Sequence, residues 1–213
     1  LFSQKKKGII PEFLEYYYNK RVEIKKHLYK AKQKLKKLKK NTPEYIDAKY
    51  EQERLNTSQM VIKILINSCY GYMGNKNAPI GDDDIASSVT LTGQAVIKYS
   101  NELIKEFIKK DIPDISDHEL EGCIIYNDTD SSYVSITPLV NKGLNFLDGK
   151  DIHKETFDKI QEIEDYLNEG VEKWAIKSLR TKDSRFVFKR ECIADVGVFL
   201  QKKRYVMHIL DDE

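Results

Sequence analysis

The feature that most constrains the fold is a short break, Asn41-Thr42-Pro43-Glu44, between two long stretches with a helical pattern. In the first stretch, residues 20–40 repeat apolar side chains at helical spacing, namely Leu28, Ala31, Leu35 and Leu38. Thr42 can cap the helix that follows, and Pro43 suits its first turn. The second helix should continue to about Tyr72. Two helices joined by so short a break predict an antiparallel helical hairpin, whose first arm spans about 35–40 Å.

The first of these helices is strongly basic, although the net charge of the 213-residue chain is only +2. Glu23 is the only acidic residue between Lys20 and Lys40. A run of charge is usually no more than a solvated face. A run of one sign and this length favours contact with a polyanion such as a nucleic acid.

Composition excludes several other classes of protein. The chain is 40% hydrophobic and 33% charged, and it contains no apolar run near the roughly 20 residues that a membrane helix needs. It begins LFSQKKKG, without an initiator Met or a signal-peptide pattern, and we expect it to be part of something longer. Cys69, Cys123 and Cys192 lie far apart among apolar neighbours, which predicts reduced core thiols in a cytoplasmic protein.

After the helical hairpin, the pattern predicts an α+β arrangement without repeats. Residues 85–110 and 154–180 should be helices, the first with Asp84 as its N-cap, and for the acidic loop Asp82–Asp84 capping is favoured over metal binding. The core face of the later helix should consist of Phe157, Ile160, Ile163, Leu167, Val171, Trp174 and Ile176. Residues 122–126 and 131–137 should form a β-hairpin, and residues 184–210 should form two or three strands.

The tip of the predicted β-hairpin carries two carboxylates, Asp128 and Asp130, on either side of Thr129. Residues two apart on a strand point to the same face, so both side chains could serve one site. Two hard oxygen ligands suit Mg²⁺, which takes one or two carboxylates together with substrate phosphates. Asp is also a common turn residue, but its place between two apolar strands makes the pattern more specific.

The second helix of the hairpin carries a polar face within KILINSCYG. Its members recur at intervals of about one turn: Lys63, Asn67, Tyr70 and Gly71. Lysine and an amide suit phosphate oxygens, the tyrosine ring suits a base or a sugar, and glycine permits close approach of a backbone. On the first helix Arg21 and Lys25 are four residues apart. If the hairpin is antiparallel, this pair and the polar face of the second helix meet, and together they would form a clamp for a triphosphate.

The stretch Lys63 to Gly71, followed by Tyr126-Asn127-Asp128-Thr129-Asp130-Ser131, resembles motifs B and C of family B DNA polymerases. The likeness is to the replicative polymerases of T-even-like bacteriophages, and it extends to the intervening GQAVIKYSNELI and to Lys202-Lys203-Arg204-Tyr205. The resemblance implies a fingers subdomain at residues 11–73 and part of a palm at residues 74–213, with an antiparallel β-sheet covered by helices.

The resemblance also implies roles for individual residues. The motif C carboxylates, Asp128 and Asp130, are catalytic and bind metal, and Glu191 matches an accessory palm carboxylate; two Mg²⁺ ions act in the complete enzyme. The incoming dNTP is held by Arg21, Lys25, Lys63, Asn67, Tyr70 and Gly71. The primer–template DNA is held by Lys202, Lys203, Arg204 and Tyr205. Asn127 stands where the family usually has glycine.

The family also has a further palm aspartate in motif A, Asp-x-x-Ser-Leu-Tyr-Pro-Ser, which lies upstream of the fingers and is not present before residue 11. We therefore expect a partial palm, with motif A, the exonuclease and the thumb on other parts of the polymerase, and possible contact with a sliding clamp. The alternative is a non-catalytic nucleic-acid-binding half of a split polymerase. An RNA-making polymerase would share the same metal chemistry. If the protein is viral, it should act in the host cell cytoplasm.

Overall fold

The computed structural model describes residues 6–212 and divides into two compact units, residues 1–88 and 89–213. The division falls within helix α3 (Asp83–Asp111), whereas the sequence places a boundary after residue 73. The assignment of fingers and palm stays a prediction. Long helices accompany three two-stranded antiparallel sheets in the described residues, so the predicted α+β class is confirmed. No helix in this part of the chain has the length and apolar character to cross a membrane.

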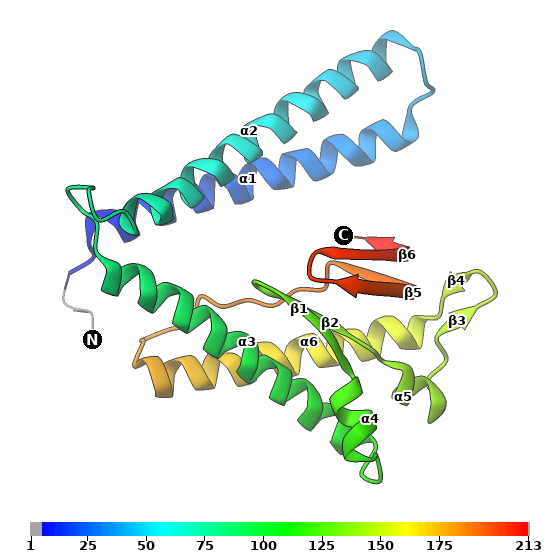
Figure 1. The fold of residues 1–213 in the computed structure, drawn as a ribbon. Coiled ribbons are helices and arrows are strands. Elements are labelled where there is room, and N and C mark those ends of the chain that lie inside the picture. Colours follow the sequence, from blue (N-terminus) through cyan, green and yellow to red (C-terminus); the bar gives the residue numbers. More distant parts are fainter. Residues whose placement is uncertain (1–5, 213) are drawn as a thin grey trace. The chain divides into compact units, whose positions relative to one another are not determined.

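The first unit contains the predicted helical hairpin, formed by α1 (Ile9–Lys37) and α2 (Pro43–Met73) (Figure 1). Helix α1 has 29 residues, which corresponds to about 44 Å. The break acts as predicted: the amide of Tyr45 donates to Oγ1 of Thr42, and Pro43 opens α2. The side chains buried in these two helices are Leu28, Ala48, Leu55, Gln59, Ile62 and Met73.

A tight loop joins α2 to α3. The amide of Asp82 donates to the carbonyl of Met73 at 2.8 Å, and the amide of Gly81 donates to the carbonyl of Ala78 at 2.8 Å. The carboxylate of Asp82 then accepts from the amides of Asp84 and Ile85, at 2.9 and 3.1 Å. The acidic loop therefore caps α3 as predicted, but the capping residue is Asp82, and Asp84, the predicted cap, lies in the first turn of the helix.

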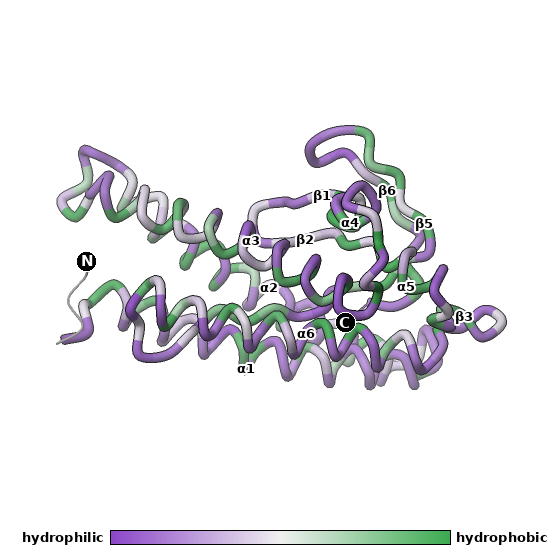
Figure 2. The backbone as a smooth tube through the Cα atoms, turned by 90° about the horizontal axis from the view of Figure 1, so that it is seen from below, coloured by the Kyte–Doolittle hydropathy of each residue, from purple (hydrophilic) through white to green (hydrophobic). Residues whose placement is uncertain are grey.

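The second unit has its core where α3 packs against α6 (Lys154–Trp174). The helices approach closely at Gly170, where an added Cβ would lie 2.5 Å from Cδ1 of the buried Leu103. Beyond this point the ring of Tyr99 stacks on Trp174, with centroids 5.6 Å apart. Figure 2 shows hydrophobic and hydrophilic stretches alternating along the helices, as expected of amphipathic helices.

Two predicted core residues of α6 are exposed instead, Phe157 to 36% and Ile176 to 44%. At the start of the helix the buried position belongs to Thr156, whose hydroxyl donates to the carbonyl of Asn145 at 2.8 Å. At the end, a π-helical turn, η1 (Ala175–Leu179), changes the number of residues per turn and buries Ala175. The regular helical spacing used for the prediction does not hold at either end.

The remaining elements of the second unit are short helices and β-hairpins. The helices are α4 (Asp117–Gly122) and α5 (Thr137–Asn141), and the strands are β1 (Ile124–Asp128), β2 (Ser131–Val134), β3 (Leu147–Asp148), β4 (Asp151–Ile152), β5 (Cys192–Gln201) and β6 (Arg204–Asp212). The C-terminal region thus has two strands. The segment before β5 does not form the third strand that the sequence allowed. It is hydrogen-bonded to α6, where the side chain of Asn168 bonds both the amide and the carbonyl of Phe188.

The three cysteines are free, as predicted. Cys123 is buried, and burial raises the pKa of its thiol. Cys69 and Cys192 are only partly buried, so the prediction of core thiols is confirmed for Cys123 alone.

Candidate nucleotide and nucleic-acid site

The two carboxylates singled out in the sequence lie at the turn between β1 and β2. Asp128 pairs with Ser131, which leaves Thr129 and Asp130 as a two-residue loop. Thr129 has a positive φ of 59°, and the amide of Asp130 donates to the carbonyl of Asp128 at 2.7 Å. The strand-alternation argument was therefore wrong for this pair, because Asp130 lies in the turn rather than on a strand.

The donor set at the turn fits a Mg²⁺ ion in its chemistry. Asp128 is half-buried and accepts a hydrogen bond from the hydroxyl of Thr129 at 3.1 Å, while Asp130 is exposed. Two carboxylates match an ion that keeps several waters and binds substrate phosphates. In residues 6–212 no three His, Cys, Asp or Glu side chains are grouped as a metal site, so Glu191 does not join the two aspartates in one. Its accessory role stays a prediction.

One face of the β1–β2 hairpin packs against the β5–β6 hairpin through four aromatic rings. Tyr126 pairs across the strands with Tyr133, and Phe199 pairs with Tyr205. All six pairings among these rings have centroids between 5.1 and 5.9 Å apart. These four residues are called the aromatic cluster below. Asp128, two positions from Tyr126 on the same strand, shares the face that carries the cluster.

The turn of the β5–β6 hairpin carries the predicted DNA-binding residues. Gln201 pairs with Arg204, so Lys202 and Lys203 form a two-residue loop, in which Lys203 has a φ of 64°. Lys202, Lys203 and Arg204 are exposed. The amide of Lys203 donates to the hydroxyl of Tyr126 at 3.0 Å. The two turns that the sequence singled out separately are thus joined through Tyr126.

Sequence reasoning missed two members of the aromatic cluster, Tyr133 and Phe199. The hydroxyl of Tyr133 donates to that of Tyr205 at 2.6 Å, while Phe199 stacks on Tyr205. A signal was present, because Tyr126 and Tyr133 occupy opposed positions of one predicted hairpin. Nothing in the local pattern indicated which other segment their rings would contact.

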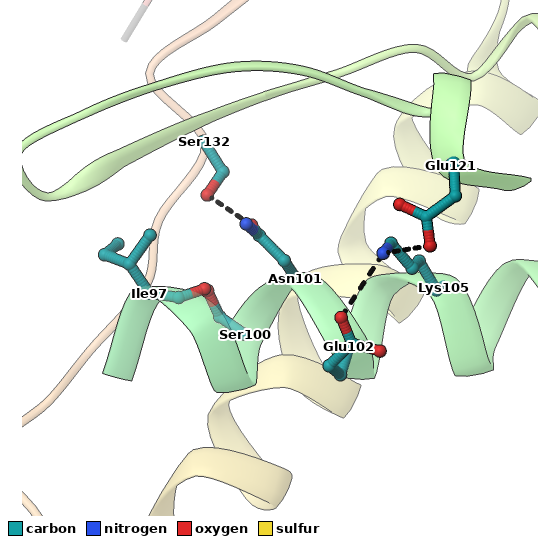
Figure 3. A network of polar contacts seen from close by, with 7 residues as sticks. All are labelled: Ile97, Ser100, Asn101, Glu102, Lys105, Glu121 and Ser132. Carbon is teal, nitrogen blue, oxygen red and sulfur yellow. Dashed lines mark hydrogen bonds and ion pairs between the residues drawn. The ribbon is translucent and has the colours of Figure 1, made fainter. Parts of the chain in front are cut away.

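The opposite face of the β1–β2 hairpin contacts α3 (Figure 3). The hydroxyl of Ser132 lies 2.8 Å from Oδ1 of Asn127 and 3.0 Å from Oδ1 of Asn101. Asn127, which stands where the resembling family has glycine, therefore has a hydrogen-bonding partner across the hairpin. Nearby, Lys105 of α3 bonds Glu121 of α4 at 2.7 Å, and this bond raises the pKa of the Lys105 ammonium.

In the first unit, Arg21 is held against α2. Its guanidinium donates to Oε1 of the buried Gln59 at 3.1 Å, while its Nε is buried without a hydrogen-bonding partner. Lys63 follows Gln59 by one turn and so lies on the same side of α2. Lys25 follows Arg21 by one turn but, because the helices are antiparallel, it lies toward the hairpin tip. Arg21 and Lys63 are thus compatible with one site, and the convergence of the whole group stays a prediction.

The other residues of the predicted nucleotide group are exposed. Asn67 and Tyr70 face solvent, and the Tyr70 hydroxyl donates to the carbonyl of Ala86 at 3.5 Å. An added Cβ at Gly71 would meet nothing within 4 Å among the described residues. Gly93 and Gly122 are equally open, so the predicted role of Gly71 stays a prediction.

Comparison with known proteins identifies the family. Residues 2–144 match the family model for DNA polymerase family B. The chain is 27% identical over 172 residues to the DNA-directed DNA polymerase of Escherichia phage RB69, and 29% identical over 173 residues to that of Enterobacteria phage T4. Each match covers 74% of this chain and 18% of the phage protein. It is also 30% identical over 132 residues to the DNA polymerase delta catalytic subunit of Glycine max, a match that covers 62% of this chain and 10% of that protein.

The chain thus spans about a fifth of the length of the phage relatives, 18% in both cases. The matched region contains the α1–α2 hairpin and the Asp128–Asp130 turn. Since the family model covers more than half of the 213 residues, the chain belongs to DNA polymerase family B.

Proposed function

We propose that the chain provides the nucleotide-binding fingers and part of the palm of a DNA-directed DNA polymerase, which adds deoxynucleotides to a primer 3′ end. The observation that carries the proposal is the bond from the Lys203 amide to the Tyr126 hydroxyl. It joins a turn with two carboxylates to a turn with three exposed basic residues. A nucleotidyl transfer site needs both, because metal-bound phosphates react beside a duplex held by its backbone.

In this proposal Asp128 and Asp130 would hold Mg²⁺, which would neutralise charge on the triphosphate and lower the pKa of the attacking hydroxyl. The protein itself contributes mainly position and charge. Arg21, Lys25 and Lys63 donate to phosphate oxygens, and Asn67 adds an amide donor. Lys202, Lys203 and Arg204 contact the primer–template backbone, whereas Tyr126 and Tyr205 fix their turn.

Closure of the helical hairpin would complete the site only around a correctly paired nucleotide. Arg21 is suited to such a role because Gln59 fixes its guanidinium through a hydrogen bond of 3.1 Å. Its Nε is buried, so phosphate oxygens would have to bind the terminal nitrogens of the guanidinium.

The test is single-turnover primer extension by the chain joined to the polymerase segments that its phage relatives have outside the match. Asp130→Asn should abolish extension and leave the affinity for primer–template nearly intact, because it removes a metal ligand and no phosphate contact. Asp148→Asn is a matched control, since Asp148 is also exposed at a β-hairpin turn. It should extend primers at the wild-type rate.

The second candidate is a non-catalytic nucleic-acid-binding half of a split polymerase, favoured by the exposed basic surface of α1. It predicts DNA binding with no catalytic contribution from Asp128 or Asp130. Extension by Asp130→Asn at the wild-type rate would therefore overturn the catalytic assignment and leave DNA binding as the function of the chain.

A further inference from the structure

Helix α1 presents an exposed tyrosine, Tyr29, among exposed lysines. Lys26 precedes Tyr29 by three residues, and Lys32 and Lys36 follow it by three and seven. At 100° per residue these four positions lie within one third of the helix circumference, on the side opposite the partly buried Ala31. They extend over about 15 Å of the helix axis. They are called the Tyr29 face below.

The side chains of the Tyr29 face are available for binding. All four are exposed, and the exposed fraction of Tyr29 is 59%. Within residues 6–212, none of the three lysines forms an ion pair, and the ring of Tyr29 packs on no other ring. Lys25 is also one turn from Tyr29, but it belongs to the proposed nucleotide site and is left out of this surface.

The other helix of the same hairpin offers an internal comparison. Tyr50 of α2 is more exposed than Tyr29, at 71%. Its charged neighbours one turn away are Asp47, Glu53 and Arg54, and Arg54 is ion-paired with Glu51, so no unpaired cation lies beside this ring among the described residues. An exposed aromatic ring is therefore common to both helices, whereas its combination with unpaired lysines distinguishes Tyr29 from Tyr50.

We propose that the Tyr29 face binds an unpaired strand of DNA. Lysines that form no ion pair with the described residues can neutralise backbone phosphates, and an exposed ring offers a surface on which a base can stack. In a duplex the base faces are already stacked on one another, so only an unpaired strand can use Tyr29. This binding does not depend on the polymerase activity proposed above, and the surface contains none of the residues assigned to that site.

The proposal is tested on the full 213-residue chain with fluorescently labelled oligothymidylate, by anisotropy at several salt concentrations. Tyr29→Ala should weaken binding by about 5- to 150-fold, the range for loss of one stacked base. Tyr29→Phe keeps the ring and should bind like the wild type. Tyr50→Ala, the matched control, should also bind like the wild type. Replacing Lys26, Lys32 and Lys36 together by Gln should reduce the slope of log K against log salt by about 2.

A duplex of the same length separates base stacking from simple charge attraction. Tyr29→Ala should leave duplex affinity unchanged, whereas the triple Gln variant should weaken both ligands. Equal binding of oligothymidylate by Tyr29→Ala and the wild type would overturn the proposal, as would an equal loss in Tyr50→Ala. Far-ultraviolet circular dichroism of each variant checks that the hairpin stays helical, so that a loss of binding is attributable to the surface.

Discussion

Tyr133 donates a hydrogen bond from its hydroxyl to the hydroxyl of Tyr205 at 2.6 Å, across 72 positions of the chain. The two tyrosines lie on different β-hairpins, one ending in the Asp128–Asp130 turn and the other in the Lys202–Lys203 turn. Burial raises the pKa of Tyr133, and the bond to Tyr205 raises it further. This hydrogen bond therefore joins the hairpin that carries the proposed metal site to the hairpin that carries the proposed DNA contact.

We expect Tyr133 to ionise at a higher pH than an ordinary tyrosine, whose pKa is about 10. Tyrosinate absorbance measured against pH should therefore contain a late transition that is missing in Tyr133→Phe. Tyr205→Phe should shift this transition only partly toward lower pH, because burial of Tyr133 remains. The exposed Tyr29→Phe should leave it in place. A wild-type titration without a late transition would contradict the expectation.

The same shift links pH to stability. The pKa of Tyr133 is raised in the folded state, so its contribution is fully present below the unfolded value and is lost as the pH rises through the folded value. Above about pH 10 the free energy of unfolding of the wild type should thus fall more steeply than that of Tyr133→Phe. Urea unfolding over this pH range measures the difference.

Gly170 should resist substitution because of the close approach of α3 and α6. Alanine is favoured over glycine in a helix by about 1 kcal/mol. At Gly170 the new methyl group would meet the buried Leu103, an overpacking cost of about 1–3 kcal/mol. At Gly93 of α3 the added Cβ meets nothing within 4 Å. Urea unfolding should show Gly93→Ala to be more stable than Gly170→Ala, and equal stability of the two would argue against the packing.

Thr42 should stabilise the helical hairpin through its cap. Thr42→Ala removes the acceptor for the Tyr45 amide, and we expect a loss of about 1 kcal/mol in the free energy of unfolding. Thr57→Ala, at an exposed position within α2, provides the control and should not destabilise the helix. Thermal unfolding followed by circular dichroism compares the two variants. No difference between them would show that the cap contributes little.

Lys63 should matter to the nucleotide and not to the stability of the hairpin. In the reconstituted polymerase, Lys63→Ala should lower kcat/KM for dNTP by about tenfold or more, the loss of one charge-assisted phosphate contact. Lys49 of α2 is also exposed and carries the same charge, but lies toward the hairpin tip. Lys49→Ala should retain the wild-type kcat/KM for dNTP. A similar loss in both variants would indicate a general effect of charge.

Interactions between near neighbours in the sequence were sufficient to predict the helical hairpin and the β1–β2 hairpin. Thr42 and Pro43 start α2 with bonds made to their near neighbours, so a capping pattern predicts the break without knowledge of the rest of the fold. The β1–β2 turn is likewise predictable, because apolar strands flank turn residues. The basic character of α1 also follows directly from the sequence. In each case the determining interactions lie within a few residues.

Tertiary structure alone decided which of these elements contact each other. The four rings of the aromatic cluster come from two segments. Their members nearest in sequence, Tyr133 and Phe199, are separated by α5, β3, β4, α6 and η1. The spacing of apolar residues along the sequence does not specify which rings will contact each other, since contact with any other ring stabilises a buried ring. For the same reason the buried face of α6 was predicted in its middle and missed at Phe157 and Ile176. At the start of the helix the buried position belongs to Thr156, which bonds a carbonyl eleven residues earlier, and at its end a π-helical turn changes the helical spacing.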